Sequence, residues 1–208
     1  RWIEDVAVPP WNLPKFIAGV KRAFTDNGFE GSLFGHAGEG NLHVNPKANV
    51  KDPETRERMR SCATRVYKLT KSLGGVISGE HGDGTMRAPY LRSMFGDAYE
   101  LMLEIKREWD PHWLMNPLTK MLRPEDEQSR DTVSDLRMGE GYKRHETGTG
   151  LDREHILEEI EKCHGCGKCR TYCPIMSVGK EERFTARAKA NLLRAVISGK
   201  LDAKSFLV

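Results

Sequence analysis

The residues best suited to chemistry lie in two glycine-rich segments that contain histidine. The first runs from residue 34 to 45 and reads FGHAGEGNLHVN, and the second runs from residue 78 to 84 and reads SGEHGDG. Two histidines and a glutamate form the donor set of a catalytic metal site, because three ligands hold the ion and a further position stays open for substrate. The same residue types also occur in turns with hydrogen-bonded histidines. Spacing alone therefore leaves these two alternatives about equal.

The first segment also predicts how its side chains are presented. Leu42 and Val44 alternate with His43 and Asn45, so a strand here would show two polar side chains on one face and two apolar ones on the other. Glycines surround His36, which indicates a tightly bent backbone or a close approach by another group.

Together the two motifs resemble those of the C-terminal (cap) domain of FAD-linked 2-hydroxy-acid oxidases and dehydrogenases. That family includes the glycolate oxidase large subunit, D-lactate dehydrogenases and D-2-hydroxyglutarate dehydrogenases, all with a vanillyl-alcohol-oxidase-type flavin domain. The resemblance covers residues 1–122 and implies an α+β fold, an antiparallel sheet layered with helices. Glu39 stands where the family more often has aspartate.

The resemblance also implies roles for individual residues. The metal ligands would be His36, His43 and Glu80, and the ion would be zinc, manganese or iron. His81 would be the catalytic base that takes the hydroxyl proton of the substrate, and Asn45 would bind the substrate or support a ligand. The implied reaction removes that proton from a D-2-hydroxy acid while a hydride passes to FAD.

A third segment, residues 113–120, resembles the Asn-Pro-Gly-Lys segment that closes the family's cap domain near the flavin. Here Leu118 and Thr119 replace the glycine and add a residue. By this resemblance Asn116 and Lys120 would contact the cofactor. A proline-capped turn after a helix is the alternative.

Composition limits the class of protein. The 208 residues carry 33 basic and 30 acidic side chains, a formal net charge of +3, with no basic block that would suggest nucleic acid as a partner. No apolar run approaches the ~20 residues of a membrane span. The chain begins at Arg1 without an initiator methionine and ends directly after a helical pattern, so we expect a fragment of a longer polypeptide.

Apolar periodicity predicts the elements that position these motifs. A strand is expected over residues 3–8, followed by helices from Pro14 to Gly28 and from Asp52 to Gly74. Val76 and Ile77 would begin a strand that delivers Glu80 and His81. A helix over residues 89–109 would place apolar side chains on one stripe: Leu91, Phe95, Ala98, Met102, Ile105 and Trp109. Residues 123–150 are charged and glycine-rich and are predicted to be a linker.

Four of the five cysteines, Cys163, Cys166, Cys169 and Cys173, lie within eleven residues and match the C-x₂-C-x₂-C-x₃-C-P run of iron–sulfur proteins. Such clustering indicates metal ligation in a reducing compartment, and we expect a cytoplasmic location, with peripheral contact at the inner face of the membrane left open. The run favours a 4Fe-4S cluster over zinc, because structural zinc usually needs two ligand pairs separated by a longer insert. Cys173 could complete this cluster or ligate one formed with a second run outside these residues.

Helical patterns flank the cysteines, over residues 152–162 and 184–198. This arrangement resembles the alpha-helical ferredoxin domain of glycerol-3-phosphate and succinate dehydrogenase subunits. A small all-α iron–sulfur domain is therefore expected over residues 151–208.

The two resemblances together imply a dehydrogenase that passes electrons from FAD to the cluster and on to a quinone pool or a carrier protein. The flavin domain and a second iron–sulfur motif would be partners supplied by the full-length protein. Two alternatives stay open: an electron-transfer and docking module whose first domain is not catalytic, and a zinc-stabilised interaction protein.

Overall fold

The computed structural model describes residues 2–117, 119–127, 131–133, 136, 138–163 and 165–202. Leu118 of the predicted flavin segment and the last residues of the chain, 203–208, lie outside the described residues. The chain forms two compact units, Arg1–Gly141 and Tyr142–Val208. The division falls inside the stretch predicted as a linker.

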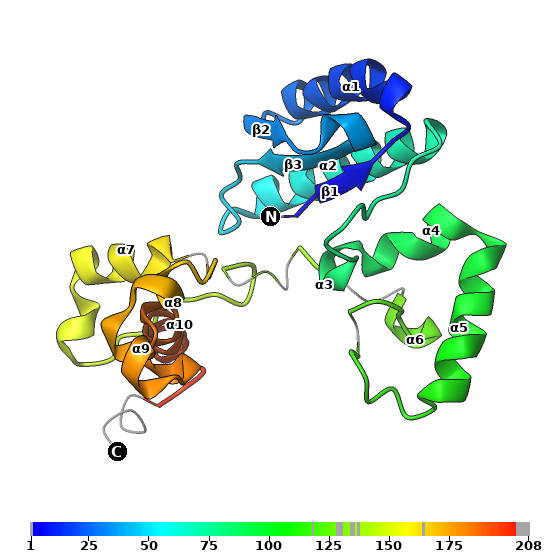
Figure 1. Ribbon diagram of the computed structural model, residues 1–208. Helices are drawn as coiled ribbons and strands as arrows, with labels where there is room; N and C mark the ends of the chain where they lie inside the picture. The colour runs from blue at the N-terminus through cyan, green and yellow to red at the C-terminus, as the bar shows by residue number, and fades with distance from the viewer. Residues whose placement is uncertain are drawn as a thin grey trace. The chain divides into compact units, whose positions relative to one another are not determined.

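A three-stranded antiparallel sheet organises the first unit (Figure 1). Its strands are β1 (Glu4–Ala7), β2 (Gly31–Phe34) and β3 (Asn41–Pro46), in the order β1-β3-β2. Asp5 and Phe34 both pair with His43, so these three residues lie on one face of the sheet. Leu42 and Val44 are buried in the core on the other face, which confirms the predicted alternation.

Two long helices cover the apolar face. After the short 3-10 helix η1 (Pro10–Asn12), α1 (Leu13–Asp26) has Pro14 in its first turn, and the chain leaves α1 at Gly28, whose φ is +66°. Helix α2 (Pro53–Ser72) is capped by Asp52, whose carboxylate accepts hydrogen bonds from the backbone N–H groups of Glu54 and Thr55. Both helices occur where periodicity predicted them.

Cys62 lies on the buried stripe of α2. Its burial raises the pKa of the thiol to about 12, so at neutral pH it is a protonated core side chain.

Two predictions for the next segment were wrong. No strand begins at Val76, which makes only a single bridge to Ala7, and Glu80 and His81 lie in a loop. The predicted helix over residues 89–109 is broken into several pieces. These are η3 (Ala88–Tyr90), α4 (Leu91–Phe95) and α5 (Asp97–Trp109), and the short helix α3 (Gly84–Arg87) precedes them.

The break at Gly96 also changes which face of α5 is buried. Gly96 has φ +57° and ends α4, so α5 starts with a new rotational phase. Tyr99 and Leu103 are fully buried, whereas Ile105 and Trp109 from the predicted stripe are 54% and 81% exposed. A short helix, α6 (Pro124–Glu127), follows.

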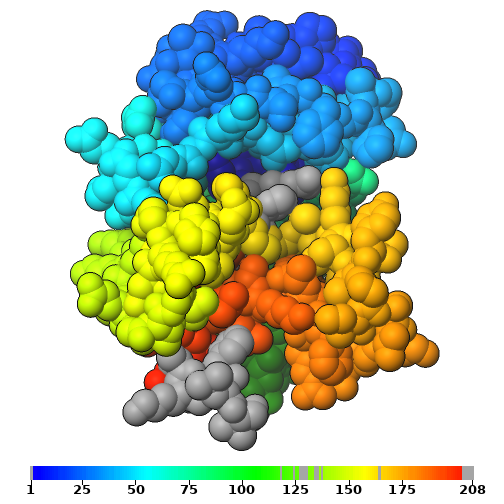
Figure 2. Space-filling model, turned by 90° about the vertical axis from the view of Figure 1, so that its left-hand side faces the viewer, coloured from blue at the N-terminus to red at the C-terminus, as the bar shows by residue number. Residues whose placement is uncertain are grey.

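The second unit is helical over its described residues. It contains η4 (Gly150–Asp152), α7 (Glu154–Lys162), α8 (Cys169–Tyr172), α9 (Pro174–Gly179), η5 (Glu182–Phe184) and α10 (Ala186–Ile197). Leu157 and Ile160 of α7 pack against Ile197 of α10, which confirms the two predicted flanking helices. The surface of this unit is coloured yellow to red in Figure 2. Within the described residues of the whole chain, no helix is long and apolar enough to span a membrane.

Candidate metal site and active site

His36, His43 and Glu80 come together at the polar face of the sheet. His36 precedes the 3-10 helix η2 (Ala37–Glu39), which turns the chain back into β3 and so brings two histidines of one segment side by side. Glu80 Oε1 lies 3.4 Å from His36 Nε2 and 3.3 Å from His43 Nε2. One ligand atom from each residue lies within 4.8 Å of the others, which is the spacing that a single metal ion needs.

Gly40 makes this turn possible. It adopts φ +74°, and a Cβ atom there would lie 1.8 Å from the carbonyl oxygen of Val8. Any other residue would push β3 away from β1, and His43 with it.

The orientations of the imidazole rings distinguish His36 from His81. The rings of His36 and His43 stand at 82° to each other, so their in-plane lone pairs can converge on one ion. The rings of His43 and His81 are stacked, with centroids 4.8 Å apart and planes 4° from parallel. Lone pairs in two stacked planes do not converge, and this geometry favours His81 for a role other than ligation.

Asp5 fixes the loop that carries Glu80 and His81. Its buried carboxylate accepts hydrogen bonds from the backbone N–H groups of Glu80 (2.9 Å) and His81 (2.7 Å), and from Asn41 Nδ2 (2.8 Å). Burial by itself would raise the pKa of Asp5, but these hydrogen bonds and the nearby Arg87 outweigh it and hold the pKa below its usual value. Asp5 is thus ionised, and its hydrogen bonds anchor Glu80 and His81, the two residues that the predicted strand was expected to position.

Glu4 lies next to His81. Both carboxylate oxygens are 3.1 Å from His81 Nδ1, and one is 4.0 Å from His43 Nδ1. This contact is the main reason that the pKa of His81 is raised. Sequence reasoning missed Glu4 and Asp5; two acidic residues at the start of a strand that is otherwise apolar were the available signal.

Unpaired polar atoms gather at this face. Within the described residues, Asn41 Oδ1, His43 Nδ1 and Asn45 Oδ1 are buried without a hydrogen-bond partner. Buried polar atoms normally have a hydrogen-bond partner. Several that lack one, beside the candidate metal ligands, are therefore consistent with a site that binds a ligand. Asn45, predicted to bind substrate, follows His43 by two residues on β3 and lies on the same face.

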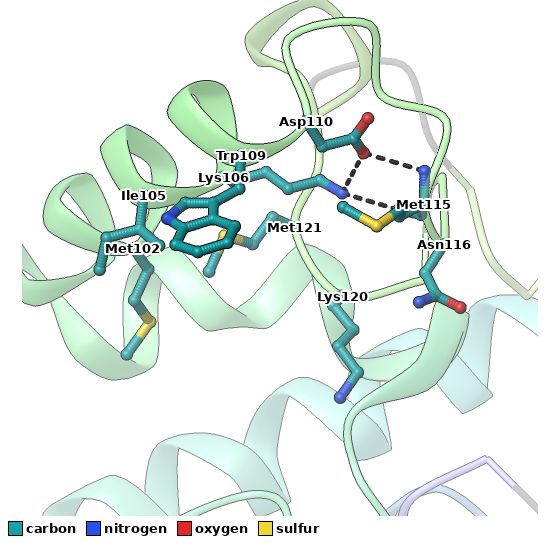
Figure 3. A pocket seen from close by; sticks show the side chains of 9 residues that line it. All are labelled: Met102, Ile105, Lys106, Trp109, Asp110, Met115, Asn116, Lys120 and Met121. Carbon is teal, nitrogen blue, oxygen red and sulfur yellow. Dashed lines mark hydrogen bonds and ion pairs between the residues drawn. The ribbon is translucent and has the colours of Figure 1, made fainter.

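Asn116 and Lys120 line a separate, mostly apolar cavity of about 320 Å³ beside α5 (Figure 3). Its other walls are side chains of α5 and of the segment after it: Met102, Ile105, Lys106, Trp109, Asp110, Met115 and Met121. Burial raises the pKa of Asp83, and the charges of Arg87 and Lys120 offset this only in part, so Lys120 acts electrostatically on the loop that follows His81. The structure thus brings the two predicted flavin-contacting residues to one cavity.

Asp110 holds the turn that presents Asn116. Its carboxylate accepts hydrogen bonds from Lys106 Nζ (2.5 Å) and from the backbone N–H group of Met115 (2.9 Å) (Figure 3). It also accepts one from the backbone N–H group of Leu114 (2.8 Å). The contact with Lys106 is the main reason that the pKa of Asp110 is lowered to about 2.

Replacing Asp110 by asparagine is expected to speed hydrogen exchange at the amides of Leu114 and Met115 and to leave the core amides of α2 unchanged. The stabilising effect of Asp110 also depends on pH. Because the pKa of Asp110 is lower in the folded chain than its unfolded value of about 3.9, its stabilising effect is complete above that value and is lost as pH falls through about 2. Unchanged exchange in D110N, compared with wild type at neutral pH, would contradict this role.

The four predicted cluster ligands lie in the segment between α7 and α9, where Cys169 is the first residue of α8. Cys163, Cys166, Cys169 and Cys173 are all free thiols, and Gly165 and Gly167 between them adopt φ +82° and +80°. Among the described residues, no three of the sulfur atoms lie close enough together to hold a single ion. A tetrahedral zinc ion with Zn–S bonds of ~2.3 Å would require sulfur atoms ~3.8 Å from one another. The ligands of a 4Fe-4S cluster bind separate iron atoms, so their sulfur atoms stand farther apart.

Two arginines of α10 hold this loop by its backbone. Arg194 is 4% exposed and donates hydrogen bonds to the carbonyl oxygens of Cys163 (2.6 Å) and Ile160 (3.1 Å). Arg187 donates to the carbonyl oxygen of Gly165 (3.3 Å). These side chains are therefore structural contacts of the cysteine segment.

Comparison with known proteins gives a family match and several relatives. The family model of the C-terminal domain of FAD-linked oxidases matches residues 1–119. D-2-hydroxyglutarate dehydrogenases from Pseudomonas putida and Escherichia coli are 31% and 29% identical, over 93% and 92% of this chain. A D-lactate dehydrogenase from Archaeoglobus fulgidus is 34% identical over 55% of the chain, a match that covers 25% of its own length.

The matches differ in how much of this chain they cover, and each covers only a small part of the relative. This chain spans 19% of the length of the two D-2-hydroxyglutarate dehydrogenases. Those two matches take in both compact units, whereas the match to the D-lactate dehydrogenase spans 115 residues, fewer than the first unit contains.

Proposed function

This chain belongs to the family of FAD-linked oxidases, and from that premise we propose that it is part of a dehydrogenase that oxidises a D-2-hydroxy acid to the 2-oxo acid. The converging arrangement of His36, His43 and Glu80 beside the stacked ring of His81 is the observation that carries the proposal. D-2-hydroxyglutarate is the first substrate to test, because the relatives with that name match both units of the chain.

The donor set fits a divalent cation held by His36, His43 and Glu80. Two neutral imidazoles and one carboxylate suit zinc, manganese or iron, and three protein ligands leave room for substrate oxygen atoms. The orphaned Oδ1 of Asn45 would accept a hydrogen bond from substrate or from a ligand. When bound, the cation would polarise the substrate hydroxyl as a Lewis acid, and FAD would take up the hydride.

The residues of this chain supply the base and its orientation. His81 Nε2 lies 3.6 Å from Glu80 Oε1, so the atom that would accept the hydroxyl proton faces the ligand group. Asp5 holds the backbone of both residues and so keeps the base and the ligand in one fixed relation. The ring of His43 packs against one face of the His81 ring.

The cavity beside α5 is proposed to face the flavin. A flat aromatic ring system with a polar edge suits a surface that combines Trp109 and methionine side chains with the polar groups of Asn116 and Lys120. Trp109 is 81% exposed in this chain, which is costly for so large an apolar group unless another part of the protein or a cofactor covers it.

The second unit is proposed to hold a 4Fe-4S cluster on Cys163, Cys166, Cys169 and Cys173. The four free thiols lie on a glycine-containing segment whose backbone accepts hydrogen bonds from Arg187 and Arg194. This arrangement suits a 4Fe-4S cluster better than it suits a single zinc ion. The cluster would carry electrons from reduced flavin toward a quinone or a carrier protein. The iron content of the purified protein tests whether Cys173 ligates this cluster or a neighbouring one.

Anaerobic purification with metal and sulfide analysis tests both parts of the proposal. We expect iron and acid-labile sulfide in the second unit and about one further divalent metal per chain. His36→Ala should weaken binding of that metal about 100-fold or more, because one of three ligands is lost. The iron and sulfide content should stay unchanged, since the cysteines are separate.

His155→Ala is the matched control, because His155 is an exposed histidine on α7. It should retain both the divalent metal and the cluster. A colourless protein with zinc at the cysteines and no sulfide would overturn the redox part of the proposal. A metal content unaffected by His36→Ala would overturn the ligand assignment.

A further inference from the structure

We propose that Glu4 is the positioning residue of this site: its carboxylate binds Nδ1–H of His81 and thereby leaves Nε2 as the proton-accepting atom. The inference rests on the proposed role of His81 as the base. It adds a residue that neither motif contains, 77 positions away from His81 in the chain.

The first argument is the chemistry of the contact. Both oxygens of Glu4 lie 3.1 Å from Nδ1 of His81. An ionised carboxylate only accepts hydrogen bonds, so the nitrogen that faces it must carry a proton. In neutral imidazole the other nitrogen then has the lone pair, and that nitrogen, Nε2, faces Glu80 Oε1 at 3.6 Å. The contact therefore selects the tautomer that a base at this position needs.

The second argument is the backbone of Glu4. In the sheet register Glu4 pairs with Val44, whose side chain points into the apolar core. A regular strand would direct Glu4 to that same face. Instead Glu4 adopts φ +58°, a left-handed conformation that is unfavourable for a residue with a side chain, and its carboxylate reaches the histidine face. Strain of this kind persists where the surrounding structure enforces it, and it is concentrated at functional sites.

A third argument excludes the competing role of Glu4 as a metal ligand. Glu4, His43 and His81 do present ligand atoms within 4.8 Å of one another. Their two imidazole planes are stacked within 4° of parallel, so the lone pairs cannot meet at one ion. The side chain of Glu4 is 13% exposed and lies 3.1 Å from Nδ1 of His81, as expected for a group that accepts a ring N–H hydrogen bond behind a site.

The test is the tautomer of His81 in this chain, measured by long-range ¹H–¹⁵N correlation at about pH 9, well above the usual histidine pKa of about 6.5. Wild type should carry the proton on Nδ1. Glu4→Ala, which removes the acceptor, and Glu4→Asp, which keeps the charge but shortens its reach, should both lose that preference. Glu4→Gln should keep it, because its amide oxygen still accepts the hydrogen bond. Glu39→Ala removes an exposed glutamate of η2 and serves as the control.

Metal binding gives the second readout. Glu4→Gln should bind a divalent cation such as Mn²⁺ with an affinity within about tenfold of wild type. Loss of Mn²⁺ binding in Glu4→Gln would overturn the proposal by making Glu4 a ligand, and a retained Nδ1–H tautomer in Glu4→Ala would overturn it by making Glu4 irrelevant. Failure of the proposed function would look different: Mn²⁺ binding that is insensitive to His36→Ala, with the Glu4 variants still changing the tautomer.

Discussion

Replacing His81 by alanine in the intact flavoprotein is expected to lower kcat for a D-2-hydroxy acid about 10²–10⁴-fold, the usual contribution of a positioned general base. The physical reason is the geometry of Nε2, which lies beside Glu80 and has no equivalent in the variant. Because the stacked ring of His81 is not placed for ligation, the divalent metal should stay bound. Steady-state turnover and metal content, measured on the same preparation, check both statements.

His155→Ala is again the matched control, since it removes an exposed imidazole from the second unit and should leave kcat unchanged. Full activity of His81→Ala would contradict the assigned role. It would instead favour an electron-transfer and docking module whose first unit takes no part in the chemistry. Loss of the divalent metal from His81→Ala would show that His81 is a ligand after all.

Replacing Asp5 by alanine is expected to lower the free energy of unfolding of the first unit by about 3–5 kcal/mol. Asp5 is fully buried and accepts the backbone N–H groups of Glu80 and His81, and the guanidinium of Arg87 lies 3.7 Å away. Alanine would leave these donors and a buried positive charge without their anion, and an unpaired buried charge is expensive. Native-state hydrogen exchange at the core amides of α2 and β3 measures the loss.

Loss of the Asp5 charge should weaken metal binding at the site more than it destabilises the fold. Asp5→Asn keeps the shape of the side chain but removes its charge and one acceptor atom, so it should fold and yet release the loop that carries Glu80 and His81. We expect weaker divalent metal binding in Asp5→Asn even where the sheet is intact. Asp26→Ala, which breaks an exposed ion pair with Arg65, is the control and should change stability by less than about 1 kcal/mol. Equal stability of Asp5→Ala and wild type would contradict the anchor role.

The sequence by itself determined the features that depend on neighbours along the chain. His36 and His43 are close because one short turn joins them, and the four cysteines lie within one short segment, so residue types and spacing were enough to single out both groups. The helices α1, α2, α7 and α10 follow from apolar periodicity and from capping residues such as Asp52. The family resemblance of the first part of the chain, found from the same motifs, agrees with the family match over residues 1–119.

The tertiary structure alone decided which distant residues meet. Periodicity reports the face that a residue occupies but not the partner that it finds there, so the pairing of β1 with β3 was needed to place Asp5 and Glu4 beside His81. The phase of α5 likewise depends on the backbone turn at Gly96, which the apolar pattern across residues 89–109 did not reveal. The site therefore combines ligands that local sequence identifies with an anchor and a positioning carboxylate that only tertiary contacts, over more than 70 residues, bring to them.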